Sequence, residues 1–276
     1  MESGAHHSTY TRRMKHRALI AILCSLAAAS AFGGVTYDFR MVTTGVQPMT
    51  IAGNVVSDGP RLRMEVDRGD GMIFKDDSVV ISRDGGKTLL VFHPPSKTFF
   101  QLPMDDVMGG AIKALQSPLL DVKFDAPKVS VHDFGDGGAI EGLPTRKMSM
   151  DATINMTIDA LGQKMTSSMI MHSETWSTDR IDRAHRNLFQ LSSPRTGIEA
   201  FDKVMDAQAA SFIGRFPLKQ VSTMRTSQNG REQVTTTTTT VTNIRDKAAD
   251  AALFADPTGY REVENPIDAM KKRLGR

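Results

Sequence analysis

Methionine is the residue type whose placement in this chain points most directly to chemistry. Seventeen of the 276 residues are methionine, and two neighbouring stretches place their methionines on alternating positions. The apolar positions are even in Lys147–Asp159 and odd in Lys164–Trp176. We assign a ligand-binding face to Met148, Met150, Ile154, Met156, Met165, Met169 and Met171. Thioether side chains are unbranched and adaptable, so a sheet face lined by them suits an apolar ligand of variable shape.

The two stretches are expected to pair with each other as an antiparallel hairpin, because alternation with period two is typical of a half-buried strand. A turn around Leu161-Gly162 sets Ile158 opposite Met165, Ile154 opposite Met169 and Ala152 opposite Met171. The other face then pairs Asp159 with Lys164, Thr157 with Thr166 and Asp151 with His172. The methionines therefore share one face of the predicted hairpin.

Three interpretations of this face remain open. The methionines can fill a packed core, as methionine often does. They can line a plastic apolar cavity for lipid or acyl chains. They can also bind Cu(I), which soft thioether sulfur suits. In the predicted register Met148 faces Thr175 and Met150 faces Ser173, so a copper site would need Met169, Met171 and a further group.

Other candidate motifs favour ordinary structural roles. Gly86-Lys87-Thr88 lacks the earlier glycine of a phosphate-binding loop, since position 81 is Ile, and it lies in a strand–turn–strand context. Gly135-Asp136-Gly137-Gly138 lacks the spaced carboxylates of a calcium loop and is expected to be a flexible turn. His93, His132, His172 and His185 have no zinc spacing, and no nucleophile motif is present. We therefore expect no enzyme, no cofactor and no metal outside the copper alternative.

Eleven strands are predicted along the chain, with two-residue hairpin signals at Asp58-Gly59 and Asn229-Gly230. The first signal sets Val55 against Leu62, Gly53 against Met64 and Ile51 against Val66. The threonine run Thr235–Thr240 is expected to be a strand, because threonine is β-branched. The predicted strands are Val35–Met41, Met49–Val55, Arg61–Asp67, Ser78–Ser82, Thr88–His93, Lys97–Leu102, Lys123–Phe134, Lys147–Asp159, Lys164–Trp176, Phe216–Ser227 and Arg231–Ile244.

Helical spacing is found in a few segments only. Met104–Gln116 has it, weakened by Gly109-Gly110, and Thr196-Gly197-Ile198-Glu199 has the form of a capping box that opens a helix to about Ile213. Ala248–Phe254 and Pro266–Arg276 are expected to be short helices. With no βαβ alternation, the pattern predicts an α+β, mainly β fold: an antiparallel sheet with two or three helices on one face. No linker divides the chain, so residues 32–276 are expected to form one domain.

The N-terminus has the features of an export signal. A basic region around Met14-Lys15-His16-Arg17 precedes the apolar stretch Ala18–Ala29, which is too short to span a bilayer. Cleavage is expected after Ala31, with Met1 or Met14 as the start. Cys24, the only cysteine, lies in this segment; cleavage before a lipid-modified Cys24 is the alternative, although Leu23 is not the small residue expected there. We expect a protein of the periplasm or outer membrane with no transmembrane span.

Removal of this segment changes the charge. Residues 1–31 hold four of the 34 basic residues and one of the 31 acidic residues, which leaves 30 of each in the rest. A formally neutral chain is poorly suited to nucleic acid, because that affinity depends on phosphate neutralisation. The remaining chain also has no cysteine, so neither a disulfide nor thiol chemistry is available to it.

Several short motifs follow one another in a recognisable order. They are Arg61-Leu62-Arg63-Met64-Glu65, Pro95-Ser96-Lys97-Thr98-Phe99, Gly142-Leu143-Pro144-Thr145-Arg146-Lys147, Glu174-Thr175-Trp176-Ser177-Thr178-Asp179 and Leu253-Phe254-Ala255-Asp256-Pro257-Thr258-Gly259-Tyr260. This order resembles an uncharacterised family of bacterial exported domains. That family is in turn similar to the periplasmic and outer-membrane lipoprotein-carrier half-barrel superfamily.

The resemblance implies a curved half-barrel sheet whose concave face is covered by helices, with an apolar cavity between them. In the carriers such a cavity holds lipoprotein acyl chains. The resemblance also implies an arginine on the sheet for ligand handover, with Arg40 and Arg63 as candidates. The leading hypothesis is a monomeric, non-enzymatic exported envelope protein that binds a lipid or another apolar ligand. A Cu(I)-binding protein and a structural or interaction module of the envelope are the alternatives.

Overall fold

The computed structural model describes residues 33–71, 73–105, 120–160, 163–182, 185, 195–211, 214–228 and 230–274. The chain divides into residues 1–33 and 34–276, and all elements below belong to the second unit. The predicted export signal, and residues 106–116 of the predicted helix Met104–Gln116, lie outside the described residues. None of the described helices has the length and apolar character needed to cross a bilayer.

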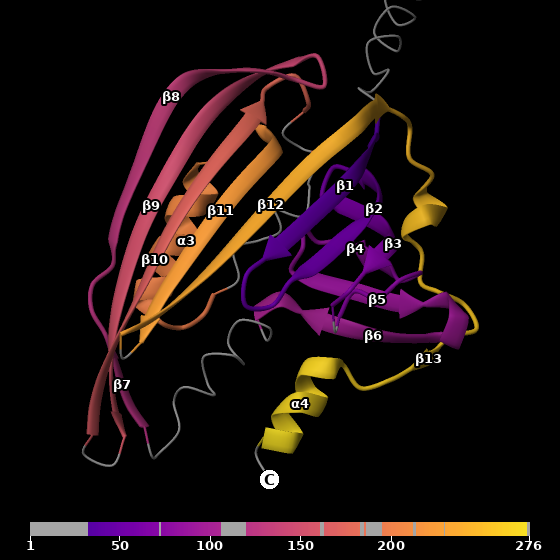
Figure 1. Ribbon diagram of the computed structural model, residues 1–276. Helices are drawn as coiled ribbons and strands as arrows, with labels where there is room; N and C mark the ends of the chain where they lie inside the picture. Colours follow the sequence, from indigo (N-terminus) through magenta and orange to yellow (C-terminus); the bar gives the residue numbers. More distant parts are fainter. Residues whose placement is uncertain are drawn as a thin grey trace, which may run out of the picture. The chain divides into compact units, whose positions relative to one another are not determined.

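The described residues form one large, open, curved sheet of thirteen strands (Figure 1). The first six strands make the predicted meander: β1 (Val35–Thr44), β2 (Met49–Asp58), β3 (Arg61–Gly69), β4 (Val79–Ser82), β5 (Thr88–His93) and β6 (Thr98–Pro103). The second group is β7 (Leu120–Phe124), β8 (Lys128–Ile140), β9 (Leu143–Ala160), β10 (Gln163–Thr178), β11 (Phe216–Gln228) and β12 (Arg231–Asp246). A short β13 (Arg261–Glu262) pairs in parallel with β6, so the sheet is mixed rather than wholly antiparallel.

The two groups of strands are joined by the pairing of β1 with β12, which we call the seam. The order is β13-β6-β5-β4-β3-β2-β1-β12-β11-β10-β9-β7, and β8 pairs with β9 beside β7. β1 is therefore next to β12, as Figure 1 shows for the indigo and orange strands near the two ends of the chain. The threonine run lies in β12 at this seam, which confirms its prediction as a strand.

Helices are few among the described residues. They are α3 (Glu199–Ala210) and α4 (Pro266–Leu274), with short 3₁₀ turns η1 (Pro94–Ser96) and η2 (Ala251–Phe254). α3 packs against β8 and β9 (Figure 1). We call the face of the sheet that α3 covers the inner face and the opposite face the outer face.

Buried apolar residues lie on both faces of the sheet. The main core on the inner face gathers side chains such as Tyr37, Val55 and Phe216, and Tyr37 meets Phe216 edge-on at 5.5 Å between ring centroids. Burial raises the pKa of Tyr37 well above its ordinary value, so this phenol stays neutral. A second cluster on the outer face includes Ile81 and Phe254 and covers the first meander with the C-terminal segment.

Two sequence predictions about the turns are wrong. Asp58 pairs with Arg61 in the ladder, so Gly59 and Pro60 form the turn, and Val55 faces Met64 rather than Leu62. The shift is two residues, so each side chain keeps its face. An ion pair between Asp58 and Arg61 holds this last rung of the hairpin.

The second error concerns the segment before the methionine hairpin. The predicted strand Lys123–Phe134 is divided between β7 and β8, and the predicted loop at Gly135–Gly138 lies within β8. Gly135 and Gly138 have positive φ angles at two breaks in the β8–β9 register, and their N–H groups donate to Asp133 and Asp136. The glycines therefore form bulges that keep the strand paired.

Candidate functional site

The methionine hairpin has the register predicted from the sequence. Ile158 faces Met165, Ile154 faces Met169 and Ala152 faces Met171 along β9 and β10. On the outer face, Asp151 faces His172, and the His172 Nδ1 lies 2.7 Å from the Asp151 Oδ1. The predicted site residues therefore lie along one face of the hairpin, on the side that α3 covers, and we call them the methionine strip.

The residues of this strip differ in burial. Met150 is only 2% exposed and, with Ala152 and Ile154, packs against Ala200 and Val204 of α3. Met169 and Met171 are partly buried and pack against the same cluster. The remaining predicted site residues, Met148, Met156 and Met165, are also partly buried. The structure thus brings four of the seven predicted site residues, Met150, Ile154, Met169 and Met171, together under α3, with Ala152 between them.

The start of α3 differs from the predicted capping box. Ile198 occupies the N-cap without a side-chain hydrogen bond, and Glu199 pairs with Lys203 at 2.6 Å. Thr196 instead donates its backbone N–H and its hydroxyl to the Asp202 Oδ1, at 2.7 and 2.8 Å. Residue type and spacing alone did not distinguish Asp202 from Glu199 as the carboxylate that accepts the hydrogen bonds of Thr196. The local bonds tie the approach to α3 to its first turn and so fix the helix above the methionines.

The methionine strip does not end at β10. Met171 faces Met224 on β11, and Met224 faces Thr235 on β12. Two residues further along the same face, Ser173 on β10 faces Ser222 on β11, and Ser222 faces Thr237 on β12. Thr237 in turn faces Thr43 on β1, and Thr43 faces Met49 on β2. Side chains of directly paired residues lie on the same face of a sheet. The inner face therefore runs without interruption from the methionine cluster across the seam between β12 and β1.

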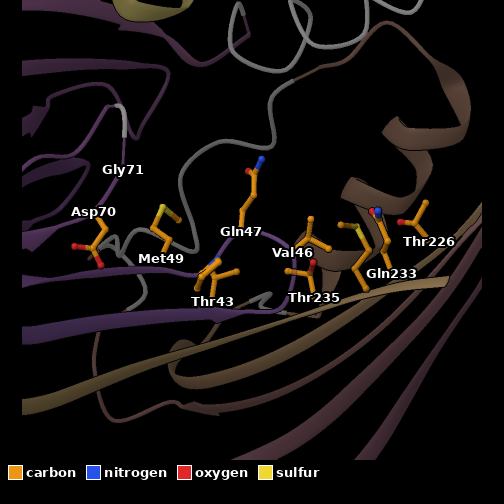
Figure 2. Close-up of a pocket in the computed structure, with 11 residues that line it drawn as sticks. Thr43, Val46, Gln47, Met49, Asp70, Gly71, Thr226, Gln233 and Thr235 are labelled. Carbon is orange, nitrogen blue, oxygen red and sulfur yellow. The ribbon is translucent and has the colours of Figure 1, made fainter. Parts of the chain in front are cut away.

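A pocket of about 520 Å³ lies on this face at the seam (Figure 2). Two methionines, Val46 and Pro48 give it apolar walls, and threonine and glutamine side chains give it polar ones. Figure 2 shows Thr43 and Thr235 pointing to the same side of the strands from opposite sides of the seam. The lining residues are Thr43, Val46, Gln47, Pro48, Met49, Asp70, Gly71, Met224, Thr226, Gln233 and Thr235.

Apolar side chains in this pocket are open to solvent. Met224 is 37% exposed and Val46 is 54% exposed. Neighbouring polar groups are hydrogen-bonded within the protein: the Thr43 and Thr237 hydroxyls lie 3.1 Å apart, and Asp70 accepts the backbone N–H of Thr50 at 3.1 Å. The pocket is therefore a mixed surface with accessible apolar groups that a ligand could contact.

Sequence reasoning did not assign Met224, Met49 or Val46 to the site. Met224 lies in the predicted strand Phe216–Ser227 and Met49 in the predicted strand Met49–Val55, so both were placed in strands but on no particular face of the whole sheet. Met224 is linked to the hairpin by the pairing of β10 with β11, and Met49 and Val46 are linked to it by the pairing of β1 with β12, whose residues are about 200 positions apart. No local pattern carries that information.

The other motifs have structural roles. Gly86-Lys87-Thr88 belongs to the turn between β4 and β5, where the Gly86 N–H donates to the Ser82 hydroxyl at 2.8 Å. Asp133 of the glycine-rich segment pairs with Arg146, whose hydrogen bond lowers the pKa of Asp133 below its usual value. Within the described ranges, no three His, Cys, Asp or Glu residues are grouped as a metal site would require.

The two arginines suggested for ligand handover both lie on the outer face. Arg63 pairs with Glu65 at 2.8 Å and donates to the Leu253 carbonyl at 3.1 Å, so it holds the C-terminal segment. Arg40 faces Thr240 and Ala52 and is exposed. Neither guanidinium is therefore placed to meet a ligand in the inner-face pocket.

Comparisons with known proteins yield structural similarity alone. No protein-family model matches the chain, and no curated protein matches it in sequence. Among solved structures, an uncharacterized conserved protein from Thermus thermophilus is 10% identical with a TM-score of 0.37, covering 89% of this chain and 98% of its own. A LolA superfamily protein from Nitrosomonas europaea is 6% identical with a TM-score of 0.31, covering 82% and 91%.

A DUF1329 family protein from Desulfovibrio piger is 9% identical with a TM-score of 0.31, covering 86% of this chain and 95% of its own. The structures similar to this chain thus include a member of the LolA superfamily.

Proposed function

We propose that this protein is a non-enzymatic, exported envelope protein that binds a lipid or another apolar ligand on the inner face of its sheet. The observation that carries the proposal is the continuity between the methionine strip and the 520 Å³ pocket, through the direct pairing of Met171 with Met224. A volume of this size lies within the range of small-molecule sites, about 300–1,000 Å³.

The chemistry of the face supports an elongated apolar ligand. Met224 and Val46 offer accessible apolar surface, while Met169 and Met171 beside them can change rotamer at low cost because methionine is unbranched. The strip beside the pocket consists of Met148, Met150, Ile154, Met156, Met165, Met169 and Met171. Lipid or lipoprotein acyl chains are the ligands that this composition fits.

The remaining parts of the proposal come from the sequence. The mature protein would begin after Ala31, would be a monomer of one domain and would act in the periplasm or at the outer membrane. The formal neutrality of the chain beyond residue 31 supports an apolar ligand over nucleic acid.

The proposal is tested on protein purified from an envelope fraction without detergent. Native mass spectrometry is expected to show a bound mass that organic extraction removes, and the extract is expected to contain lipid. Binding of a fluorescent fatty-acid probe should then be stronger after extraction. Protein that carries no extractable lipid and does not bind the probe would contradict the proposal.

A Cu(I) site is the second candidate, and one observation favours it. The sequence offered only two ligands for a copper site, Met169 and Met171. In the structure a third methionine, Met224, lies directly opposite Met171 on the same face. Titration with Cu(I) under reducing conditions is expected to give one tight site if copper is the ligand. Its persistence in a Met169→Leu/Met171→Leu variant, or no binding by the wild type, would exclude this site.

A further inference from the structure

A row of basic side chains crosses the outer face, on the side of the sheet opposite the pocket. Lys147 on β9 faces Trp176 on β10, which faces Lys219 on β11. Lys219 faces Thr240 on β12, and Thr240 faces Arg40 on β1. Since neighbouring strands lie about 4.8 Å apart, the three cations recur roughly every 10 Å along a line across five strands.

Trp176 lies between the two ammonium groups of this row. The Lys147 Nζ is 4.8 Å from the centre of its ring and the Lys219 Nζ is 4.9 Å away. The Lys147 Nζ is also 5.5 Å from the ring centre of Phe134, which is 59% exposed. An exposed aromatic ring beside lysines is the combination found where proteins meet the interfacial region of a membrane.

The charge of the row is only partly neutralised by neighbouring acids. Lys147 is paired with Glu174 at 2.6 Å. Asp38, two residues from Arg40, accepts hydrogen bonds from Asn54 and Asn243. Among the described residues, Lys219 and Arg40 have no carboxylate within ion-pair distance. The row therefore presents two cations without a carboxylate partner, Lys219 and Arg40, and one ion-paired cation, Lys147, beside accessible aromatic surface.

We propose that this outer-face row, Lys147, Trp176, Lys219 and Arg40 with Phe134, docks the protein on a membrane surface that contains anionic lipid. Lysine and arginine would meet the phosphates, and the Phe134 ring would enter the interfacial layer. The inner-face pocket would then face away from the bilayer. The docking surface is independent of the proposed ligand site, because the two lie on opposite faces.

The test uses the full chain and phosphatidylcholine vesicles with or without phosphatidylglycerol. Trp176 is the only tryptophan, so its fluorescence reports on this surface directly. We expect binding to the anionic vesicles with a blue shift of the emission, and quenching by brominated lipid. Binding should weaken as salt is raised, because salt screens exposed charges.

Two charge-matched variants locate the surface. Arg40→Gln/Lys219→Gln is expected to lower the affinity about tenfold or more, whereas Lys203→Gln/Lys272→Gln, which removes two lysines from α3 and α4, should retain it. Phe134→Ser changes an exposed side chain and should reduce the blue shift without unfolding the protein. Equal binding to both kinds of vesicle, unchanged Trp176 emission, or equal losses in the two double variants would overturn the proposal.

Discussion

Met171 and Met224 face each other across the β10–β11 ladder, and this one pair joins the buried methionine cluster to the solvent-open pocket. Met171 packs with the cluster beneath α3, whereas Met224 lines the pocket wall. A ligand in the pocket is therefore next to side chains that can repack to accommodate it.

The first prediction concerns ligand binding at this pair. Met224→Glu places a carboxylate in the apolar wall, so binding of a fluorescent fatty-acid probe is expected to fall at least about tenfold, because burying an unpaired charge is costly. Ile170→Glu is the matched control, since Ile170 is similarly exposed, at 47% against 37%, but lies on the outer face. Equal losses in both variants would place the probe elsewhere.

The second prediction separates stability from binding within the methionine strip. Met150→Ala removes a buried side chain from the contact with Ala200 and Val204, so it is expected to lower the free energy of unfolding by about 2–5 kcal/mol. Met224→Ala removes a partly exposed side chain and should cost less than about 1 kcal/mol. Denaturant unfolding measures both, and equal costs would mean that α3 does not cover Met150 in solution.

The third prediction concerns the pH dependence of the α3 start. Burial alone would raise the pKa of Asp202, but the hydrogen bonds from Thr196 outweigh it and lower the pKa below the ordinary value of 3.8. The carboxylate thus adds stability at pH values above 3.8, and this contribution is lost as the pH falls through the lower folded-state pKa. An NMR titration should show Asp202 titrating below 3.8.

Removing the Asp202 carboxylate supplies the complementary measurement. Asp202→Ala is expected to cost about 1 kcal/mol at neutral pH, a typical value for a lost cap-type hydrogen bond at a partly exposed site. The cost should shrink in acid, where the wild-type carboxylate is protonated. Thr196→Val keeps the backbone donor and should cost less. A cost for Asp202→Ala that does not vary with pH would contradict this assignment.

The fourth prediction concerns the C-terminal segment on the outer face. The Arg83 Nε donates to the Phe254 carbonyl at 2.6 Å, and its Nη2 lies 2.8 Å from the Asp256 carboxylate. Arg83→Lys cannot make both contacts from one planar group, so residues 251–256 should exchange amide hydrogens faster. Arg231→Lys at an exposed hairpin end is the control, and unchanged exchange in both variants would show that Arg83 does not hold the segment.

The parts of the fold that the sequence predicted are those set by local alternation. The β9–β10 register followed from facing apolar positions in Lys147–Asp159 and Lys164–Trp176, because a slip of one residue would expose Met150 and bury Asp151. The six-strand meander followed from similar patterns. The register of the β2–β3 hairpin was wrong by two residues, because such a slip leaves every side chain on its face and the apolar pattern does not oppose it.

Features set by distant pairing or by backbone detail could not be predicted in the same way. Gly135 and Gly138 were predicted to lie in a loop, because glycine is common in both turns and bulges. Only the pairing with β9 distinguishes the two. The pocket depends on the contact of β1 with β12, which has no short-range signal. Its residues Gln233 and Thr235 were predicted as strand residues without a shared role, and Thr43 lay beyond the end of the predicted strand Val35–Met41.

The seam between β1 and β12 also has a consequence for how the protein folds. Most pairings within each group join strands that are consecutive in the chain, whereas the seam joins residues about 200 positions apart. Long-range pairing carries a large loop-closure entropy and forms slowly. We therefore expect seam closure to be the late kinetic step, and only then do Thr43 and Met49 meet Met224 and Thr235. A ligand that bridges the seam would slow unfolding and so lengthen the lifetime of the folded chain.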